Sequence, residues 1–333
     1  MKVAFFSTKS YDKQSFDHIL PDHSHEFTYF EPKLDSNTVA LSKGYDAICT
    51  FVNDKLDEKI LNILNEIGVK SIVLRCAGYN QVDLQKAAEL GFKICRVPAY
   101  SPEAVAEHAL ALLMTLSRKT HKAYNRVRDN NYSLEGLTGF NINGKTTGVI
   151  GTGAIGKAFS RIMLGIGCKV LAYDIKENEE LKKQGVTYMS LDELLTLSDI
   201  ISLHCPLNSD TFHLINKQRL AQMKDGVVLI NTSRGALIES KAVIQALKIK
   251  KVGNLGIDVY EQEEDLFFQN RSEEILQDED IARLMTFPNV LITGHQAFLT
   301  NEALSQISEI TLKNLDELEE GKKLTNEVVW KEA

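Results

Sequence analysis

The sequence of 333 residues lacks several features that mark specialised classes of protein. Its five cysteines are odd in number and scattered, and none forms a CxxC pair, so we expect reduced thiols and no metal ion. No apolar run reaches about 18 residues, the length that a membrane-spanning helix needs. Residues 1–6 form an apolar run of strand length and not a secretion signal. We therefore expect a cytoplasmic protein with no membrane partner.

A surplus of positive charge is also missing. The formal net charge is −7, with 38 Lys and Arg against 45 Asp and Glu. Nucleic acid is not an expected partner, because nucleic-acid binding usually needs clustered basic residues. A small anionic substrate would instead need a local positive group. The composition, 44% hydrophobic and 25% charged, is that of a folded protein, and the length favours two domains.

A glycine-rich turn is the most informative feature that is present. The segment Gly151-Thr152-Gly153-Ala154-Ile155-Gly156 follows an expected strand and leads into an expected helix. In such a turn the first glycine permits the tight bend, the second lets the backbone approach a pyrophosphate, and the third lets the helix pack against the sheet. Free N–H groups at the start of the helix attract the phosphates. The segment therefore predicts a dinucleotide site, although a glycine pattern alone would also fit an ordinary turn.

An acidic residue follows where a dinucleotide needs one. Asp174 ends the next expected strand, and its side chain can accept hydrogen bonds from the ribose hydroxyls. Its negative charge would repel a 2′-phosphate, so NAD(H) is favoured over NADP(H), although Lys176 lies two residues on. Strand, glycines, helix, strand and acid in this order form a much more specific signal than the glycines alone.

Two series of alternating strands and helices predict two Rossmann-like or flavodoxin-like α/β domains with doubly wound parallel sheets. The first series has strands at 2–6, 47–52, 71–75 and 92–97, and helices at 58–67 and 83–90. The second has strands at 146–150, 169–173, 200–204, 227–231, 254–259 and 290–293, and helices at 191–197, 217–223 and 241–247. We expect a last helix, at 302–320, to return to the first domain. The predicted domains are residues 1–100 with 299–333 for the substrate and 101–298 for NAD, with the active site in the cleft between them.

Two side chains with distinct chemistry follow later strands of the second series, where ligands bind in such folds. Arg234 has a planar guanidinium that can hold a carboxylate through two parallel hydrogen bonds. His295 suits a group that donates and accepts a proton near neutral pH. Taken singly, the arginine would also fit a surface residue that caps a helix, and the histidine a structural role. His108, within an apolar helix that opens after Ser101, is interpreted as a packed or interface histidine.

Two further segments leave alternatives open. Several acidic residues near the end of strand 254–259 are able to orient the histidine, and spacing does not choose among them or exclude a solvated loop. They are Asp258, Glu261, Glu263, Glu264 and Asp265. The segment His204-Cys205-Pro206-Leu207 is interpreted as backbone contact with the nicotinamide. Cys205 as a nucleophile is the disfavoured alternative, because hydride transfer needs no covalent intermediate.

In this order the motifs resemble those of the D-isomer-specific 2-hydroxyacid dehydrogenase family, over essentially the whole chain. The motifs are Gly151-x-Gly153-x-x-Gly156, His204-Cys205-Pro206-Leu207, Asn231-Thr232-Ser233-Arg234-Gly235, Gly256-x-Asp258-Val259-Tyr260-Glu261-x-Glu263 and Gly294-His295. Two longer segments, residues 97–108 and 293–300, are similar to the branch of bacterial fermentative D-lactate dehydrogenases.

The resemblance implies roles for the candidate residues. Arg234 would bind the substrate carboxylate, His295 would be the general acid and base, and Glu263 would be its partner. Asp258 would support cofactor binding and the electrostatics of the site. The other residues implied in cofactor binding belong to the fingerprint or follow later strands: Gly151, Gly153, Ala154, Ile155, Gly156, Asp174, Cys205, Pro206, Thr211, Thr232 and Ser233.

The resemblance also implies substrate contacts from the first domain. In Arg75-Cys76-Ala77-Gly78-Tyr79-Asn80, the N–H groups of Ala77 and Gly78 would reach the carboxylate. Tyr100 and Phe298 would enclose the methyl side of the substrate. Cys76 stands where some relatives carry asparagine, so a polar side-chain contact at that position is in doubt.

The reaction and the assembly follow from the resemblance as well. It implies NADH-dependent reduction of pyruvate to D-lactate, in either direction, and the hand of the product rests on the resemblance alone. The alternatives are a dehydrogenase for another, bulkier or more polar D-2-hydroxy acid, and a non-catalytic NAD(H)-sensing protein. The presence of Arg234, Glu263 and His295 together disfavours the sensor. A homodimer or a dimer of dimers is expected through helices of the NAD-binding domain.

Overall fold

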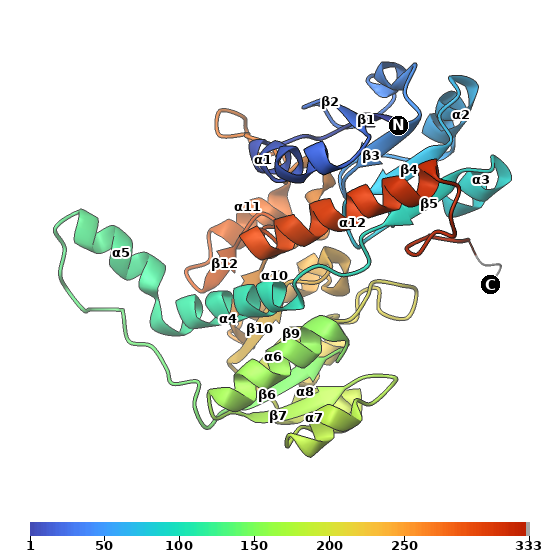
Figure 1. Ribbon diagram of the computed structural model, residues 1–333. Coiled ribbons are helices and arrows are strands. Elements are labelled where there is room, and N and C mark those ends of the chain that lie inside the picture. The colour runs from blue at the N-terminus through green and yellow to red at the C-terminus, as the bar shows by residue number, and fades with distance from the viewer. Residues whose placement is uncertain (331–333) are drawn as a thin grey trace. The chain divides into compact units, whose positions relative to one another are not determined.

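The structure, a computed structural model, describes residues 1–330 and divides the chain into two compact units (Figure 1). Unit 1 comprises Met1–Ser101 together with the chain after Ala297, and unit 2 comprises Pro102–Ala297. Each unit contains one sheet in which all paired strands are parallel. The predicted class, two α/β domains with parallel sheets, is confirmed.

Unit 1 has a five-stranded sheet in the order β2-β1-β3-β4-β5. The strands are β1 (Lys2–Phe5), β2 (Glu26–Tyr29), β3 (Ala47–Thr50), β4 (Ser71–Leu74) and β5 (Lys93–Arg96). Its α-helices are α1 (Ser10–Ile19), α2 (Glu58–Glu66), α3 (Leu84–Glu89) and α12 (Asn301–Glu319). The last helix begins where the Thr300 side chain accepts the Ala303 N–H, and it packs on α1, β4 and β5. The chain therefore leaves unit 1 after β5 and returns to complete it.

The sequence analysis missed two elements of unit 1, α1 and β2. β2 is an edge strand without a fully buried residue, and α1 buries only Asp12 and Phe16. Neither element therefore carries the continuous or periodic apolar pattern that identified its neighbours.

Unit 2 has a seven-stranded sheet in the order β12-β11-β10-β9-β6-β7-β8. The strands are β6 (Thr146–Ile150), β7 (Lys169–Tyr173), β8 (Thr187–Tyr188), β9 (Ile200–Leu203), β10 (Val227–Asn231), β11 (Val252–Ile257) and β12 (Val290–Ile292). The longer helices are α4 (Pro102–Arg118), α5 (Thr120–Arg128), α6 (Ala154–Gly165) and α10 (Ser240–Lys248). The shorter ones are α7 (Glu179–Lys183), α8 (Leu191–Leu197), α9 (Lys217–Gln222) and α11 (Glu279–Met285).

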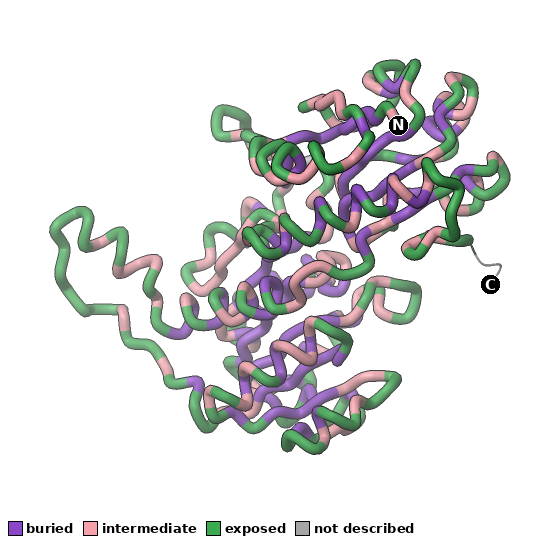
Figure 2. Tube along the Cα trace, viewed as in Figure 1, coloured by how far each residue is buried: buried purple, intermediate pink, exposed green. Residues whose placement is uncertain are grey.

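Burial follows the sheets, and Figure 2 shows the strands of both units as mostly buried. Helix α4 packs against α6, β10 and β11 with one face, while Glu107, Ala111 and Met114 stay exposed on another. The exposed stripe is partly apolar, so within one chain α4 is not buried on every side. Among the helices of residues 1–330, none combines the length and apolar character needed to cross a bilayer.

Candidate active site

The candidate residues of unit 2 follow strands that are neighbours in its sheet. The run β6-β9-β10-β11-β12 is continuous, and β7 and β8 extend from the other side of β6. Because all these strands are parallel, the loops after them lie along one edge. The order of the strands reverses beside β6, which is the position where doubly wound sheets bind nucleotides.

The three glycines after β6 each meet a different steric demand. Gly151 has a φ of +90°, and a Cβ atom there would lie 2.7 Å from the backbone nitrogen of Cys205. A Cβ atom on Gly156 would lie 1.9 Å from the carbonyl oxygen of Gly151, so the helix packs against the turn only with glycine at this position. A Cβ atom on Gly153 would meet nothing within 4 Å. The second glycine therefore leaves open space in front of the helix, as a pyrophosphate requires.

The start of α6 offers unsatisfied donors to that space. Gly153 is the N-cap residue and supplies no side-chain cap, so the first N–H groups of the helix remain available for phosphate oxygens. Asp174 after β7 accepts the N–H of Thr152 at 2.5 Å and that of Lys176 at 3.0 Å. The carboxylate thus holds the turn in shape, and its remaining lone pairs can accept ribose hydroxyls. The residues present fit an NAD molecule.

His204 and Cys205 follow β9, and their backbone lies against Gly151 of the glycine turn. His204 is buried against Phe159, and burial lowers the pKa of its imidazole to about 3. Burial also raises the pKa of the Cys205 thiol to about 11. A thiol with so high a pKa is a poor nucleophile near neutral pH, which argues against covalent catalysis by Cys205.

The loop after β10 positions Arg234. Asn231 accepts the Ser233 N–H at 3.0 Å and donates its amide to the Arg234 carbonyl oxygen at 2.8 Å. Among the side chains that the structure describes, no carboxylate pairs with the Arg234 guanidinium, which leaves it available to an anionic substrate. The Thr232 hydroxyl is buried and has no hydrogen-bond partner in the described chain. Such an orphaned group at a predicted cofactor edge is consistent with a partner supplied by the ligand.

His295 and Glu263 form a close pair. Nδ1 of His295 lies 2.8 Å from Oε1 of Glu263, and both side chains are mostly buried. The other oxygen of Glu263 accepts the Tyr260 N–H at 2.8 Å. A carboxylate fixed in this way orients the imidazole. His295 also has a φ of +56°, a left-handed conformation that residues other than glycine rarely adopt.

Asp258, after β11, holds the loop that carries His295. Its two oxygens accept the N–H groups of Gln296 at 2.9 Å and Ala297 at 2.8 Å, and its carbonyl oxygen accepts the His295 N–H at 2.7 Å. Burial would raise the pKa of Asp258, but hydrogen bonds from His108, Thr293 and the two N–H groups outweigh it and lower the pKa. Asp258 is therefore an ionised, fully buried anchor.

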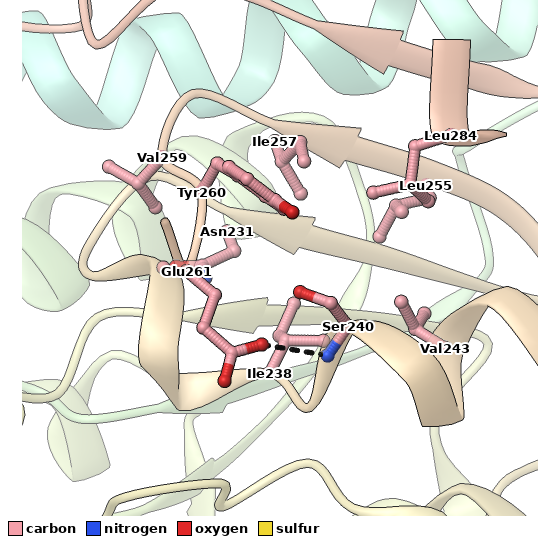
Figure 3. A pocket seen from close by; sticks show the side chains of 11 residues that line it. Asn231, Ile238, Ser240, Val243, Leu255, Ile257, Val259, Tyr260, Glu261 and Leu284 are labelled. Carbon is pink, nitrogen blue, oxygen red and sulfur yellow. Dashed lines mark hydrogen bonds between the residues drawn. The ribbon is translucent and has the colours of Figure 1, made fainter. Parts of the chain in front are cut away.

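The other acidic residues of this segment are not close partners of His295. Glu261 accepts the Ser240 N–H at the start of α10 at 3.1 Å, and Figure 3 shows its carboxylate directed at that nitrogen. Its other oxygen lies 2.5 Å from Nε2 of His213. Glu264 is exposed, and the side chain of Asp265 lies outside the described part. Of the five acids that spacing left open, the structure brings the Glu263 carboxylate to the imidazole.

In unit 1, Arg75 is the first residue of the loop after β4, and its side chain fixes that loop to the segment after β1. This buried guanidinium contacts Asp12 at 3.3 Å, donates to the Ser7 carbonyl oxygen at 2.9 Å, and lies over a phenylalanine ring. Arg96 donates to the Ala77 carbonyl oxygen at 2.6 Å. Among the hydrogen bonds of residues 1–330, none uses the N–H of Ala77 or of Gly78. These two donors are therefore free to meet an anion.

Tyr100 and Phe298 also lie together in unit 1. Their ring centroids are 6.1 Å apart in an edge-on arrangement, and Phe298 lies 5.7 Å from the Phe51 ring. Phe298 is buried, whereas Tyr100 is half-buried. The three rings make an apolar wall.

Comparison with known proteins identifies the family to which this chain belongs. Residues 110–297, more than half of the chain, match the family model described as D-isomer specific 2-hydroxyacid dehydrogenase, NAD binding domain. The chain belongs to the D-isomer-specific 2-hydroxyacid dehydrogenase family. The protein is an NAD-dependent oxidoreductase, as the sequence predicted.

Relatives extend the similarity over the full length. The chain is 52% identical over 329 residues to D-lactate dehydrogenase of Escherichia coli (strain K12), covering 99% of this chain and 100% of the relative. A solved structure of the pyruvate reductase of Chlamydomonas reinhardtii is 46% identical, with a TM-score of 0.93 and 98% of each chain covered. D-lactate dehydrogenase from Aquifex aeolicus, solved with NAD and lactic acid, is 35% identical, with a TM-score of 0.87, 99% of this chain and 100% of that chain covered.

Two residues near the dehydrogenase site were not assigned to it by sequence. Nε2 of His108 lies 3.0 Å from the Thr293 hydroxyl and 3.4 Å from Asp258, so this helix residue contacts the side chain that holds the His295 loop. The Phe268 ring packs at 5.6 Å from the His295 ring. A single histidine in an apolar helix and a single phenylalanine in a loop carry no spacing signal, so only the folded chain reveals these contacts.

Proposed function

We propose that this protein reduces pyruvate to D-lactate with NADH and catalyses the reverse oxidation with NAD. The observation that carries the proposal is the His295–Glu263 pair at 2.8 Å, on the same strand-end edge as Arg234 and the dinucleotide turn. A proton donor with an orienting carboxylate, a guanidinium that no described carboxylate pairs with and a phosphate-binding helix start are the parts that a 2-keto acid reductase needs.

Substrate binding is assigned to Arg234, whose fork holds the carboxylate through two parallel hydrogen bonds. Ala77 and Gly78 are proposed as further donors to that carboxylate. A substrate held by its carboxylate presents its keto carbon in a fixed orientation, which lowers the entropic part of the barrier.

Proton transfer is assigned to His295. Bound NADH supplies the hydride that the keto carbon accepts. The developing alkoxide takes the proton from Nε2 of His295, because Nδ1 is engaged by Glu263. In lactate oxidation the neutral imidazole accepts the hydroxyl proton, and Glu263 stabilises the imidazolium that forms.

Tyr100 and Phe298 support a small substrate. The aromatic carbons of the two rings favour an apolar substituent such as a methyl group, and the Tyr100 hydroxyl is the one polar atom they carry. The names of the relatives agree with this choice, since one is a pyruvate reductase and another was solved with lactic acid. The second candidate is a dehydrogenase for a bulkier D-2-hydroxy acid, which would require the rings to move apart.

A panel of keto acids with NADH and NADPH in parallel tests the proposal. We expect kcat/KM to be highest for pyruvate and to fall for hydroxypyruvate, 2-ketoisocaproate and phenylpyruvate. A maximum at one of the larger acids would support the second candidate, and no oxidation of NADH with any acid would favour an NAD(H)-sensing protein. Enzymatic assay of the product with enantiomer-specific enzymes decides its hand.

Assembly and location also belong to the proposal. The chain is proposed to form a homodimer or a dimer of dimers in the cytoplasm, with unit 1 as the substrate domain. Support for the dimer comes from α5, which has no buried residue, and from apolar side chains exposed on α5 and just after it. They are Tyr124, Val127, Tyr132 and Leu134.

A further inference from the structure

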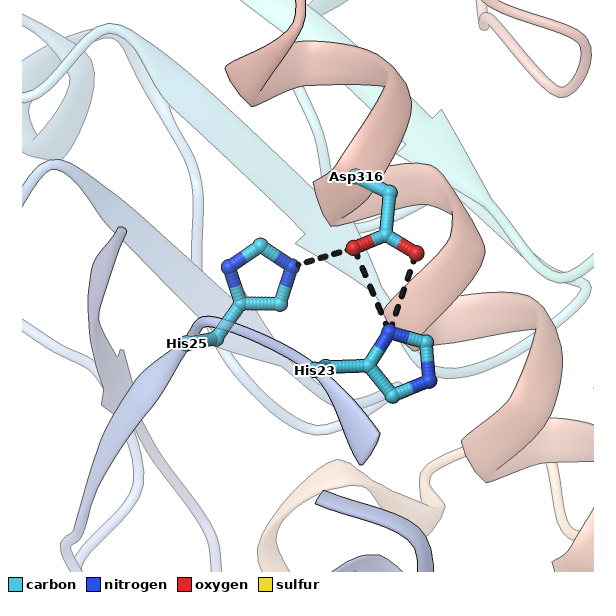
Figure 4. A group of neighbouring side chains, drawn as sticks. All are labelled: His23, His25 and Asp316. Atoms are coloured by element: carbon cyan, nitrogen blue, oxygen red, sulfur yellow. Dashed lines mark hydrogen bonds and ion pairs between the residues drawn. The ribbon is translucent and has the colours of Figure 1, made fainter. Parts of the chain in front are cut away.

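Three potential metal ligands meet in unit 1, and the reductase chemistry uses none of them. They are His23 and His25, on the segment that leads into β2, and Asp316 on α12. Figure 4 shows both imidazole rings directed at the Asp316 carboxylate. The histidines precede the aspartate by about 290 residues, so no local motif reveals the group.

The contacts are close. Nδ1 of His23 lies 2.9 Å from one oxygen of Asp316, and Nε2 of His25 lies 3.0 Å from the other. All the candidate ligand atoms lie within 4.8 Å of one another. Ligands of a tetrahedral ion with bonds of about 2.0–2.2 Å are roughly 3.3–3.6 Å apart. The two nitrogen–oxygen distances are shorter than this, so the side chains must separate slightly to admit an ion.

We propose that His23, His25 and Asp316 bind a divalent transition-metal ion of the zinc class, with water completing the coordination. Two imidazoles and one carboxylate are the donor set that such ions prefer, whereas calcium and magnesium favour oxygen ligands alone. The ion would join the segment before β2 to α12, two elements of unit 1 that come from opposite ends of the chain.

The surroundings of His25 favour a metal ligand. Its side chain is fully buried, and its Nε2 faces the Asp316 carboxylate at 3.0 Å. Nδ1 of His25 lies 3.3 Å from the ammonium nitrogen of Met1 and 3.6 Å from a Glu319 oxygen, so these two groups fix the ring while Nε2 faces Asp316.

The rival interpretation is a hydrogen-bonded cluster that never binds a metal. The two interpretations differ in what added metal does. A bridging ion stabilises the folded state by mass action, and the effect requires all three ligands. An ion-free cluster responds to pH but not to zinc at micromolar concentration.

The test uses tag-free protein stripped with EDTA and titrated with ZnCl₂ by calorimetry at neutral pH, together with thermal unfolding. We expect one equivalent of zinc to bind and to raise the Tm. His23→Gln and Asp316→Asn should each weaken binding at least ten-fold and remove the Tm shift. His18→Gln, an exposed histidine on α1 of the same unit, is the matched control and should bind zinc as the unaltered chain does.

Three results would overturn the proposal. The first is that the unaltered chain binds no equivalent of zinc, and the second is that the His23 and Asp316 variants both bind zinc with the affinity of the unaltered chain. The third is that His295→Gln removes the equivalent, which would place the ion on the His295–Glu263 pair. Circular dichroism of each variant verifies that a lost equivalent does not reflect a lost fold.

Discussion

Glu263 contacts His295 through one carboxylate oxygen at 2.8 Å and the Tyr260 N–H through the other, also at 2.8 Å. The carboxylate is thereby fixed at both oxygens before substrate binds. The imidazole in turn keeps one orientation, with Nε2 left for the substrate. An acid and base held in this way needs little reorganisation in the transition state.

Replacing Glu263 by Gln should lower kcat for pyruvate reduction. A neutral amide holds the imidazole less firmly than a carboxylate whose two oxygens are both engaged. We expect kcat to fall about ten-fold while the dissociation constant for NADH changes little.

Glu261→Gln provides the matched control for that experiment. Its carboxylate contacts Ser240 and His213, so the same chemical change two residues away should leave kcat unchanged. An equal loss of kcat in both variants would mean that the loss reflects general electrostatics and not the proposed pair.

His295→Gln should reduce kcat for pyruvate by about 10²–10⁴-fold, the contribution typical of a general acid. The dissociation constant for NADH, measured by fluorescence, should change little, because the glycine turn and Asp174 are untouched. Retention of most of the kcat would contradict the assignment of the proton donor.

Arg234→Lys should raise the KM for pyruvate strongly while NADH binding persists. Lysine retains the charge but not the planar fork, so the expected loss in kcat/KM is on the order of 10²-fold, or two to three kcal/mol. Arg234→Gln should be worse. If lysine restores full kcat/KM, charge alone is sufficient and the two-bond contact is wrong.

Asp258→Asn should destabilise unit 2 and reduce kcat. The variant loses charge-assisted hydrogen bonds to the N–H groups of Gln296 and Ala297, each worth about 1.5–3 kcal/mol. Because the pKa of Asp258 is lowered by folding, its contribution is complete above the unfolded pKa of about 3.9 and is lost as the pH falls through the lower folded pKa. The Tm difference between the two proteins should therefore be constant near neutral pH and shrink in acid.

Leu134→Asp should dissociate the proposed dimer. Leu134 is 81% exposed, and a charge within an apolar interface leaves a buried, unpaired carboxylate. Light scattering should show the mass of one 37.3 kDa chain for the variant and a multiple of it for the parent. Ile275→Asp, at 85% exposure on a different segment of unit 2, should leave the mass of the parent unchanged.

Continuous buried strands were the most predictable part of the fold. β6, β7 and β10 have the predicted bounds, because short segments rich in buried residues between turn residues leave few alternatives. β8 has two residues and β2 lies at a sheet edge, so neither carries such a run. Their existence depends on neighbours that only the folded chain supplies.

The candidate site was predictable to a different degree at each residue. Arg234 and His295 could be singled out because their positions after strands and their chemistry agree. Glu263 could be chosen only through the family resemblance, because five acids share its segment. Asp258 accepts hydrogen bonds from the backbone N–H groups of Gln296 and Ala297. Because almost every residue has a backbone N–H, the residue pattern could not predict these contacts.

The return of α12 to unit 1 affects how the protein is made. A ribosome completes unit 2 as one uninterrupted stretch, and that unit has all its strands before α12 emerges. Until then, the surfaces of α1, β4 and β5 in the first hundred residues stay uncovered, because α12 is the element that packs on them. Folding during synthesis would therefore finish in the middle of the chain before it finishes at the start, the reverse of the usual order from the amino terminus.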